Sequence, residues 1–131
     1  MNKTTLIAST LIVVFVVIGG MFFLQKTEPR TEFSQEDLTE FATCLKESGA
    51  KFYGAFWCSH CRNQKAAFKE AVDALPYIEC STEDSRGQTD VCKEAGITSY
   101  PTWEFSNGTR LSGEVPFADL AQNSGCSAPT L

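Results

Sequence analysis

The stretch AFWCSHCRNQ, Ala55 to Gln64, contains two of the six cysteines of the chain and its single histidine, His60. Two residues separate Cys58 from Cys61. This spacing suits three purposes: a pair that forms and breaks a disulfide, half of a metal site, or a permanent cross-link. The residues around the pair favour the first of these interpretations.

A strand is expected before the cysteine pair and a helix after it. The run KFYGAFW, 51–57, is short and aromatic, which is typical of a buried strand. Apolar residues then recur at helical spacing from Ser59 to about Ala74, and Pro76 ends the pattern. The apolar face of this helix is expected to comprise Ala66, Ala67, Phe68, Ala71 and Val72.

A strand-to-helix junction favours a reactive cysteine, because the first N–H groups of a helix lack partners and its dipole attracts an anion. In C-x-x-C motifs such surroundings lower a cysteine pKa from about 8.5 to roughly 3.5–7. We therefore expect Cys58 to be the nucleophile and Cys61 the resolving thiol. His60 is expected to stabilise the Cys58 thiolate, which makes a disulfide more oxidising; the alternative is a solvated residue without influence.

Metal binding and a permanent cross-link agree less well with the sequence. A structural zinc site needs four ligands, whereas a second C-x-x-C motif and a second histidine are absent. We assign no metal ligands and expect no cofactor beyond the redox-active disulfide Cys58–Cys61. A soft-metal carrier, such as a copper chaperone, stays open as an alternative.

The remaining segments predict an α/β fold with a central mixed sheet and helices on both faces. Helices are expected from an N-cap at Ser34 to Gly49, from Thr89 to Ala95, and from Pro116 to Gly125; a strand is expected at Tyr77–Cys80, and a hairpin with a type I′ turn at Asn107-Gly108 over residues 101–113.

The N-terminal segment predicts a membrane anchor. Leu6 to Leu24 carries no charged residue, and as a helix it would cover roughly 28 Å, close to the ~30 Å of bilayer hydrocarbon. It lacks the small-residue cleavage site of a signal peptide. We therefore expect an anchor over 1–24, a tether over 25–33, a folded domain over 34–126 and a tail over 127–131.

Composition restricts the compartment and the partners. Positive residues flank the apolar segment almost equally, so they do not set its orientation. Six cysteines in a small domain indicate an oxidising compartment, and we expect the domain on the periplasmic or extracytoplasmic side of the cell membrane. A net charge of −5 without a basic cluster argues against nucleic acid as a partner.

Several motifs together resemble a known family. FYGAFWCSHC, YIEC, a cysteine in the next helix and SYPTWEF are similar to the thioredoxin-like domain associated with bacterial vitamin K epoxide reductase homologues, over roughly Glu40 to Cys126. The resemblance implies a thioredoxin fold with Cys58 as nucleophile and Cys61 as resolving thiol. The other site residues it implies are Pro101 as a cis-proline facing the pair, Ser99 and Tyr100 as backbone partners of a substrate, and Trp57 as part of the surface beside the site.

The chain departs from ordinary thioredoxins at two places. They carry Gly-Pro between the cysteines, where this chain has Ser59-His60. They also carry a buried acid six residues before the nucleophile, where this chain has Phe52. Glu79 is a possible substitute for that acid, although we expect it to be an exposed residue at the end of a strand.

The four other cysteines allow more than one pairing. Cys80 and Cys92 are close in sequence, and we expect them to form a structural bridge; a second redox pair is the alternative. Cys44, late in the first helix, and Cys126, after the last, are expected to form another structural bridge at the sheet end opposite the active site.

The resulting hypothesis is a membrane-anchored thiol–disulfide oxidoreductase of the oxidase or isomerase type. Its expected partners are exported cysteine-containing proteins and a quinone-linked membrane disulfide oxidase that recharges it. Two alternatives stay open: a thiol reductant serving a maturation or repair pathway, and a non-enzymatic metal-carrying module.

Overall fold

The computed structural model describes residues 32–131. The expected membrane anchor over 1–24 and most of the expected tether lie outside these residues. Within the described part of the chain, no helix has both the length and the apolar character needed to cross a bilayer.

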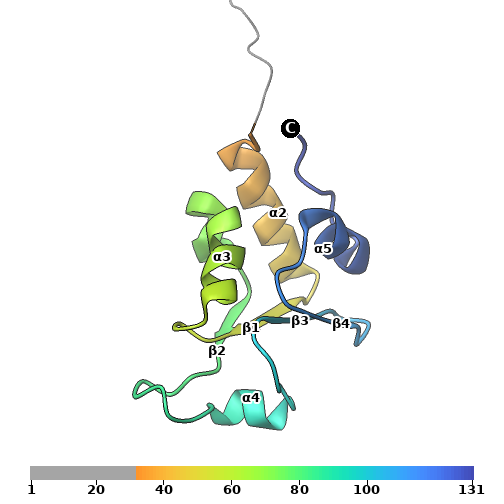
Figure 1. Cartoon of the computed structure of the whole chain (residues 1–131). Helices are drawn as coiled ribbons and strands as arrows, with labels where there is room; N and C mark the ends of the chain where they lie inside the picture. The colour runs from red at the N-terminus through yellow and green to blue at the C-terminus, as the bar shows by residue number, and fades with distance from the viewer. Residues whose placement is uncertain (1–31) are drawn as a thin grey trace, which may run out of the picture. The chain divides into compact units, whose positions relative to one another are not determined.

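A four-stranded mixed sheet forms the centre of the domain (Figure 1). Its strands follow the order β2-β1-β3-β4, with bounds β1 Lys51–Gly54, β2 Tyr77–Glu79, β3 Thr102–Glu104 and β4 Arg110–Ser112. β1 pairs in parallel with β2 and antiparallel with β3, and β4 closes the hairpin antiparallel to β3. The predicted mixed sheet is thus confirmed.

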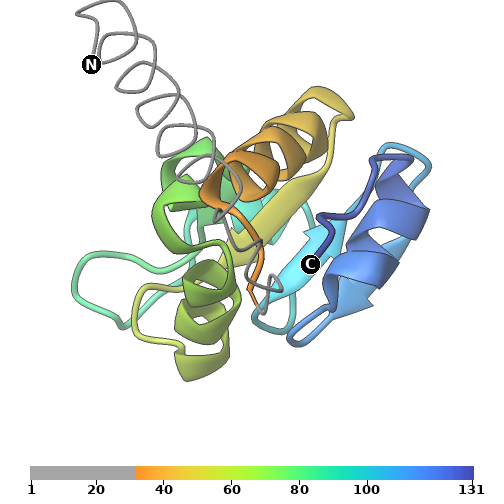
Figure 2. The same cartoon turned by 90° about the horizontal axis from the view of Figure 1, so that it is seen from above.

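Helices lie on both faces of the sheet (Figures 1 and 2). One face carries α2 Gln35–Glu47, α3 Ser59–Ala67, the 3-10 helix η1 Lys69–Ala74 and α5 Phe117–Ser124; the other carries α4 Asp90–Glu94. The alternation of side chains along a strand explains the two layers. Phe52 on β1 stacks on Trp103 of β3 within the larger core, whereas the next residue, Tyr53, packs with Cys80, Cys92 and Ile97 on the α4 side.

Helix α2 begins and ends as its sequence predicts. The Ser34 side chain accepts a hydrogen bond from the backbone N–H of Asp37 at 3.1 Å, which satisfies one of the free donors at the helix start. The apolar side chains at helical spacing, Leu38, Phe41, Ala42 and Leu45, are buried. Gly49 follows the helix with a φ of 82°, a conformation that glycine adopts at little cost.

The prediction of a single helix from Ser59 to about Ala74 is wrong, because this segment forms two helices, α3 and η1. Lys69 at the break has a φ of 51°. Contacts with the start of α2 and the residues before it support this break: the Gln35 side chain accepts the N–H of Glu70 at 3.3 Å, and Lys69 binds Glu32 at 2.8 Å.

The apolar face expected for this helix is partly wrong as well. Ala66 and Ala67 are exposed. Phe68 and Ala71 of the expected set are buried, and Cys61 and Gln64, which the prediction did not include, are buried as well. Cys61, Gln64 and Phe68 lie three and four residues apart on one side of the helix. The two small alanines therefore face solvent, although their apolar character suggested the core.

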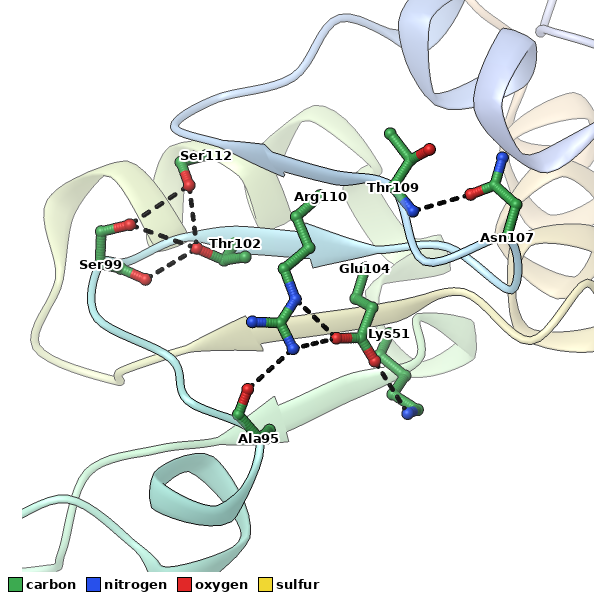
Figure 3. Close-up of polar contacts among 9 residues, drawn as sticks. All are labelled: Lys51, Ala95, Ser99, Thr102, Glu104, Asn107, Thr109, Arg110 and Ser112. Carbon is green, nitrogen blue, oxygen red and sulfur yellow. Dashed lines mark hydrogen bonds and ion pairs between the residues drawn. The ribbon is translucent and has the colours of Figure 1, made fainter.

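The predicted type I′ turn between β3 and β4 is also wrong. Such a turn requires a positive φ at both central residues, whereas only Gly108 has one, at 82°. The loop is a residue longer: the N–H of Gly108 donates to Phe105 O at 2.8 Å, and the N–H of Phe105 donates to Thr109 O at 2.9 Å. The Asn107 side chain accepts the N–H of Thr109 at 2.9 Å (Figure 3).

Candidate active site

The two cysteines of the motif lie at the start of α3, directly after the sheet. The expected strand over 51–57 ends earlier, at Gly54, and the turn that follows places Cys58 at the N-cap of α3, with its N–H donating to Ala55 O at 3.0 Å. Cys58 and Cys61 are free thiols, 8% and 1% exposed. Of the two sulfurs, that of Cys58 is therefore the one open to a second molecule.

A cis peptide bond precedes Pro101, beside the cysteine pair. The carbonyl oxygen of Tyr100 lies 3.7 Å from the Cys58 sulfur, so the Tyr100–Pro101 segment forms one wall of the site. Side-chain hydroxyls hold this segment to the hairpin (Figure 3): Thr102 Oγ1 donates to the Ser99 carbonyl at 2.9 Å, and the hydroxyls of Ser99 and Ser112 lie 3.2 Å apart.

Aromatic side chains form the surface next to Cys58. Phe56 and Trp57 are about half exposed, at 48% and 49%. The Trp57 indole N–H donates to Ser81 Oγ at 2.8 Å, and its ring contacts that of Tyr100 edge to face. An exposed apolar surface held in a fixed position suits the docking of a partner protein. The structure thus brings Trp57 and Tyr100 together at the site.

His60 points toward the connection between β4 and α5. Its Nδ1 lies 2.7 Å from Glu114 Oε1, and Asn63 donates to the same oxygen at 3.0 Å. These two hydrogen bonds lower the pKa of Glu114. The effect of His60 on the Cys58 thiolate stays a prediction.

The sequence did not indicate Gln64, which anchors α3. This side chain is buried, and its amide makes two hydrogen bonds with the backbone of Val115. Glutamine side chains are usually exposed. The one feature of the sequence that could have indicated the burial of Gln64 is its position three residues after Cys61, on the same helix face.

The surroundings of Cys61 are closely packed. Burial raises the pKa of this thiol to about 12. A Cβ atom added at Gly54 would lie 3.0 Å from the Cys61 sulfur and 2.8 Å from Cε2 of Tyr77. The absence of a side chain at Gly54 therefore makes room for both groups.

Glu79 is not the exposed strand-end residue expected from the sequence, because its side chain is partly buried in a hydrogen-bonded network. Tyr77 donates its hydroxyl to Glu79 Oε2 at 2.7 Å, and Ser81 and Phe56 donate backbone N–H groups to Oε1 at 2.8 and 3.3 Å. Burial and this carboxylate raise the pKa of Tyr77. Phe52, at the position of the thioredoxin acid, lies in the apolar core.

The other four cysteines form the two bridges expected from the sequence. Cys44–Cys126 joins α2 to the residue after the C-cap of α5, and Cys80–Cys92 joins the end of β2 to α4. Among residues 32–131 no group of three or more histidine, cysteine, aspartate or glutamate side chains could hold a metal ion.

A mixed sheet, a free C-x-x-C pair at a helix start and a facing cis-proline define a thiol–disulfide exchange domain. The profile of the Thioredoxin family matches residues 33–123, and the chain belongs to that family. Relatives of this chain carry the names thiol-disulfide oxidoreductase and protein disulfide-isomerase.

Three relatives illustrate the range of similarity. The chain is 42% identical over 105 residues to Thiol-disulfide oxidoreductase LTO1 of Arabidopsis thaliana, covering 75% of this chain and 28% of the relative. It is 27% identical over 85 residues to mitochondrial Thioredoxin-3 of Saccharomyces cerevisiae, covering 60% and 64%. It is 25% identical over 101 residues to a protein disulfide-isomerase of Aspergillus niger, covering 73% and 19%. The chain thus spans less than two thirds of each relative.

Proposed function

We propose that the protein is a membrane-anchored oxidoreductase that exchanges disulfides with exported cysteine-containing proteins on the extracytoplasmic side. A quinone-linked membrane disulfide oxidase would recharge its Cys58–Cys61 pair. The observation that carries the exchange step is the pairing pattern: Cys58 and Cys61 are free at the start of α3, while the other four cysteines are bridged.

The proposed reaction uses the two thiols in sequence. In the oxidising direction, a substrate thiolate attacks the Cys58 sulfur of the Cys58–Cys61 disulfide, and Cys61 leaves as a thiolate that takes up a proton. A second substrate thiolate then attacks the substrate sulfur of the mixed disulfide and displaces the Cys58 thiolate. The Tyr100 carbonyl beside the Cys58 sulfur is positioned to pair with a substrate backbone. Exposed Phe56 and Trp57 offer an apolar contact next to the reacting atom.

The exchange step can be tested on the full-length chain with a scrambled, disulfide-bonded ribonuclease as substrate. Wild-type protein is expected to restore ribonuclease activity, Cys58→Ser to abolish this effect, and Cys61→Ser to accumulate mixed disulfides with the substrate. Ser59→Ala, a change between the two cysteines that spares both thiols, is the matched control. Full activity of Cys58→Ser would disprove the proposal.

The direction of electron flow follows from the reduction potential of the pair. A value of about −120 to −180 mV supports an oxidase or isomerase, and one near about −270 mV supports a reductant. Tight binding of Cu(I) by the reduced protein, without exchange activity, would instead support the metal-carrying module.

Anchoring and recharging need separate measurements. The uncharged segment 6–24 and the two additional bridges support an anchored domain in an oxidising compartment. In intact cells, a membrane-impermeant thiol reagent is expected to label reduced Cys58. Membranes are expected to reoxidise the reduced protein only when quinone is present; equal rates in quinone-depleted membranes would contradict the proposed partner.

A further inference from the structure

The resolving step requires a charged sulfur in a buried place. When Cys58 is joined to a substrate, the Cys61 thiolate attacks the Cys58 sulfur. The bond between Cys58 and the substrate breaks, the Cys58–Cys61 bond forms, and the substrate sulfur leaves as a thiolate that takes up a proton. Cys61 gives up one proton before it attacks and the departing substrate thiolate takes one up, so no proton is gained or lost overall. The difficulty lies in forming the Cys61 anion at a position that is 1% exposed.

The residue that ordinary thioredoxins place near the resolving thiol is missing here. Phe52 occupies its position and stacks on Trp103, with ring centroids 4.6 Å apart. Neither side chain carries a charge. Some other group must therefore reduce the cost of forming the thiolate.

Lys65 lies close to Cys61 on the same helix face. The two residues are four positions apart on α3, a spacing that brings side chains together. The Lys65 ammonium nitrogen lies 3.1 Å from the centroid of the Tyr77 ring. The edge of that ring and the Cys61 sulfur both lie over Gly54, within 3.0 Å of the point where its Cβ would be. Lys65, Tyr77 and Cys61 thus form one contiguous group.

We propose that the Lys65 ammonium group stabilises the Cys61 thiolate during resolution, and that Tyr77 and Glu79 hold Lys65 in place for this purpose. The inference deepens the proposed disulfide exchange and rests on it. It assigns the stabilisation of the Cys61 anion to a lysine of α3, held by a tyrosine–glutamate pair of β2, in a chain with Phe52 where thioredoxins carry the buried acid.

Each partner has a separate contribution. The Tyr77 ring offers its negatively polarised face to the ammonium group, and its hydroxyl is fixed by Glu79 at 2.7 Å. Burial lowers the pKa of Lys65, whereas the negative charges of Glu79 and of the Cys61 thiolate favour its ammonium form. In the free dithiol, a hydrogen bond and the charge of Cys58 also raise the pKa of Cys61, whereas a Cys58 sulfur bonded to a substrate carries no charge.

A two-phase reaction separates the roles of the cysteines. The reduced full-length chain is mixed with an aromatic disulfide that releases one coloured thiol when Cys58 attacks it and a second when Cys61 resolves the adduct. The rate of the second phase is expected to rise with pH between 6.5 and 8.5, because the pKa of Cys61 lies far above this range.

Three variants test the charge of Lys65. Lys65→Met is expected to slow the second phase at least about tenfold, which equals one pKa unit of thiolate stabilisation, and to leave the first phase within about twofold. Lys65→Arg keeps the charge and should retain most of the rate. Tyr77→Phe keeps the ring but loses the link to Glu79, so a loss of about threefold is expected.

The matched control is Lys93→Met on α4, which removes an exposed lysine paired with Asp90, and both phases should stay unchanged. A purely structural role for Lys65 would slow both phases or affect Lys65→Arg equally, and either result would overturn the inference. An unchanged second phase in Lys65→Met, or in Lys65→Gln should the methionine variant fail to fold, would overturn it too. Loss of the first phase in wild-type protein would instead contradict the proposed function.

Discussion

Gln64 and Val115 are joined by two buried hydrogen bonds. The backbone N–H of Val115 donates to Gln64 Oε1 at 2.6 Å, and Gln64 Nε2 donates to the Val115 carbonyl at 3.2 Å. The Gln64 side chain thus satisfies both backbone groups of a residue just before α5. This pairing attaches α3, the helix at whose start Cys58 and Cys61 lie, to the segment just before α5.

Replacing Gln64 by leucine should destabilise the domain by about 2–4 kcal/mol, because it leaves two buried backbone groups of Val115 unpaired. Urea unfolding of the full-length chain would measure the loss as a lower transition midpoint. The control is Asn63→Ala, which removes an exposed hydrogen bond to Glu114 and should cost less than about 1 kcal/mol. Equal losses in the two variants would contradict the anchoring role.

Gly54→Ala should disturb the site although neither cysteine is replaced. The new methyl group would lie 2.8 Å from the Tyr77 ring and 3.0 Å from the Cys61 sulfur, closer than packed atoms allow. Overpacking of this kind costs about 1–3 kcal/mol. We expect lower stability together with slower resolution of a Cys58 mixed disulfide, as followed by the release of the coloured thiol.

A second glycine provides the control for this prediction. Gly87 lies in a partly exposed loop, where an added Cβ would meet only the Thr82 side chain, at 3.3 Å or more. Gly87→Ala should leave resolution unchanged. If Gly54→Ala resolved at the wild-type rate, the close packing over Cys61 would not matter for the reaction.

The two bridges should differ in their effect on stability. In the chain-entropy model, a disulfide stabilises a protein chiefly because it lowers the conformational entropy of the unfolded chain, and this effect grows with the length of the closed loop. Cys44–Cys126 spans a sequence separation of 82 and Cys80–Cys92 one of 12. The chain-entropy model gives about 4.5 and about 3 kcal/mol, respectively.

Double serine variants of each pair, unfolded by urea, would measure this difference. The alternative for Cys80/Cys92 is a second redox pair, and its test is peptide mapping after thiol trapping during turnover. A Cys80–Cys92 bridge that stays closed while Cys58–Cys61 cycles agrees with a structural role. A bridge that opens together with Cys58–Cys61 would contradict it.

The sequence predicted the elements whose signals are local. The cap at Ser34, the aromatic strand before Cys58 and the glycine after α2 each depend on neighbours within a few residues, and each is present in the structure. The pair Cys58 and Cys61, which is unbridged in the structure, was also indicated by local spacing at a strand-to-helix junction.

Features that depend on distant residues could not be predicted. The break at Lys69 is supported by the start of α2, and the burial of Gln64 depends on Val115. In both cases a tertiary hydrogen bond outweighs the local preference. Glu79 differs, because Tyr77 and Ser81 lie only two residues away and Phe56 is the one distant partner among the three.

Glu104 should contribute a pH-dependent part of the stability. Burial opposes its ionisation, but hydrogen bonds from Lys51 and Arg110 outweigh this effect and lower its pKa (Figure 3). A carboxyl group with a lower pKa in the folded state stabilises the protein above its unfolded pKa and loses this contribution as the pH falls. Glu104→Gln should therefore be less stable than wild type at pH 7, with a difference that shrinks below about pH 4.5.

Urea unfolding between pH 3 and 7 would measure this dependence. The control is Asp90→Asn on α4, whose carboxylate is almost fully exposed beside Lys93; exposed ion pairs contribute little. A constant difference between wild type and Glu104→Gln over the whole range would contradict the assignment of the effect to ionisation.

His60→Ala should make the Cys58–Cys61 pair more reducing. His60 follows Cys58 by two residues in the first turn of α3, and Glu114 holds its ring through the 2.7 Å contact at Nδ1. A group that stabilises the Cys58 thiolate stabilises the reduced state, so its loss shifts the reduction potential to more negative values. We expect a shift of roughly 15–30 mV, which corresponds to a three- to tenfold change in the equilibrium constant with glutathione.

Glu114→Gln should shift the potential in the same direction but more weakly, because the histidine remains. Asn63→Ala, which removes an uncharged partner of the same carboxylate, serves as the control. A potential that stays within a few millivolts of wild type in His60→Ala would mean that the ring only joins α3 to the segment before α5.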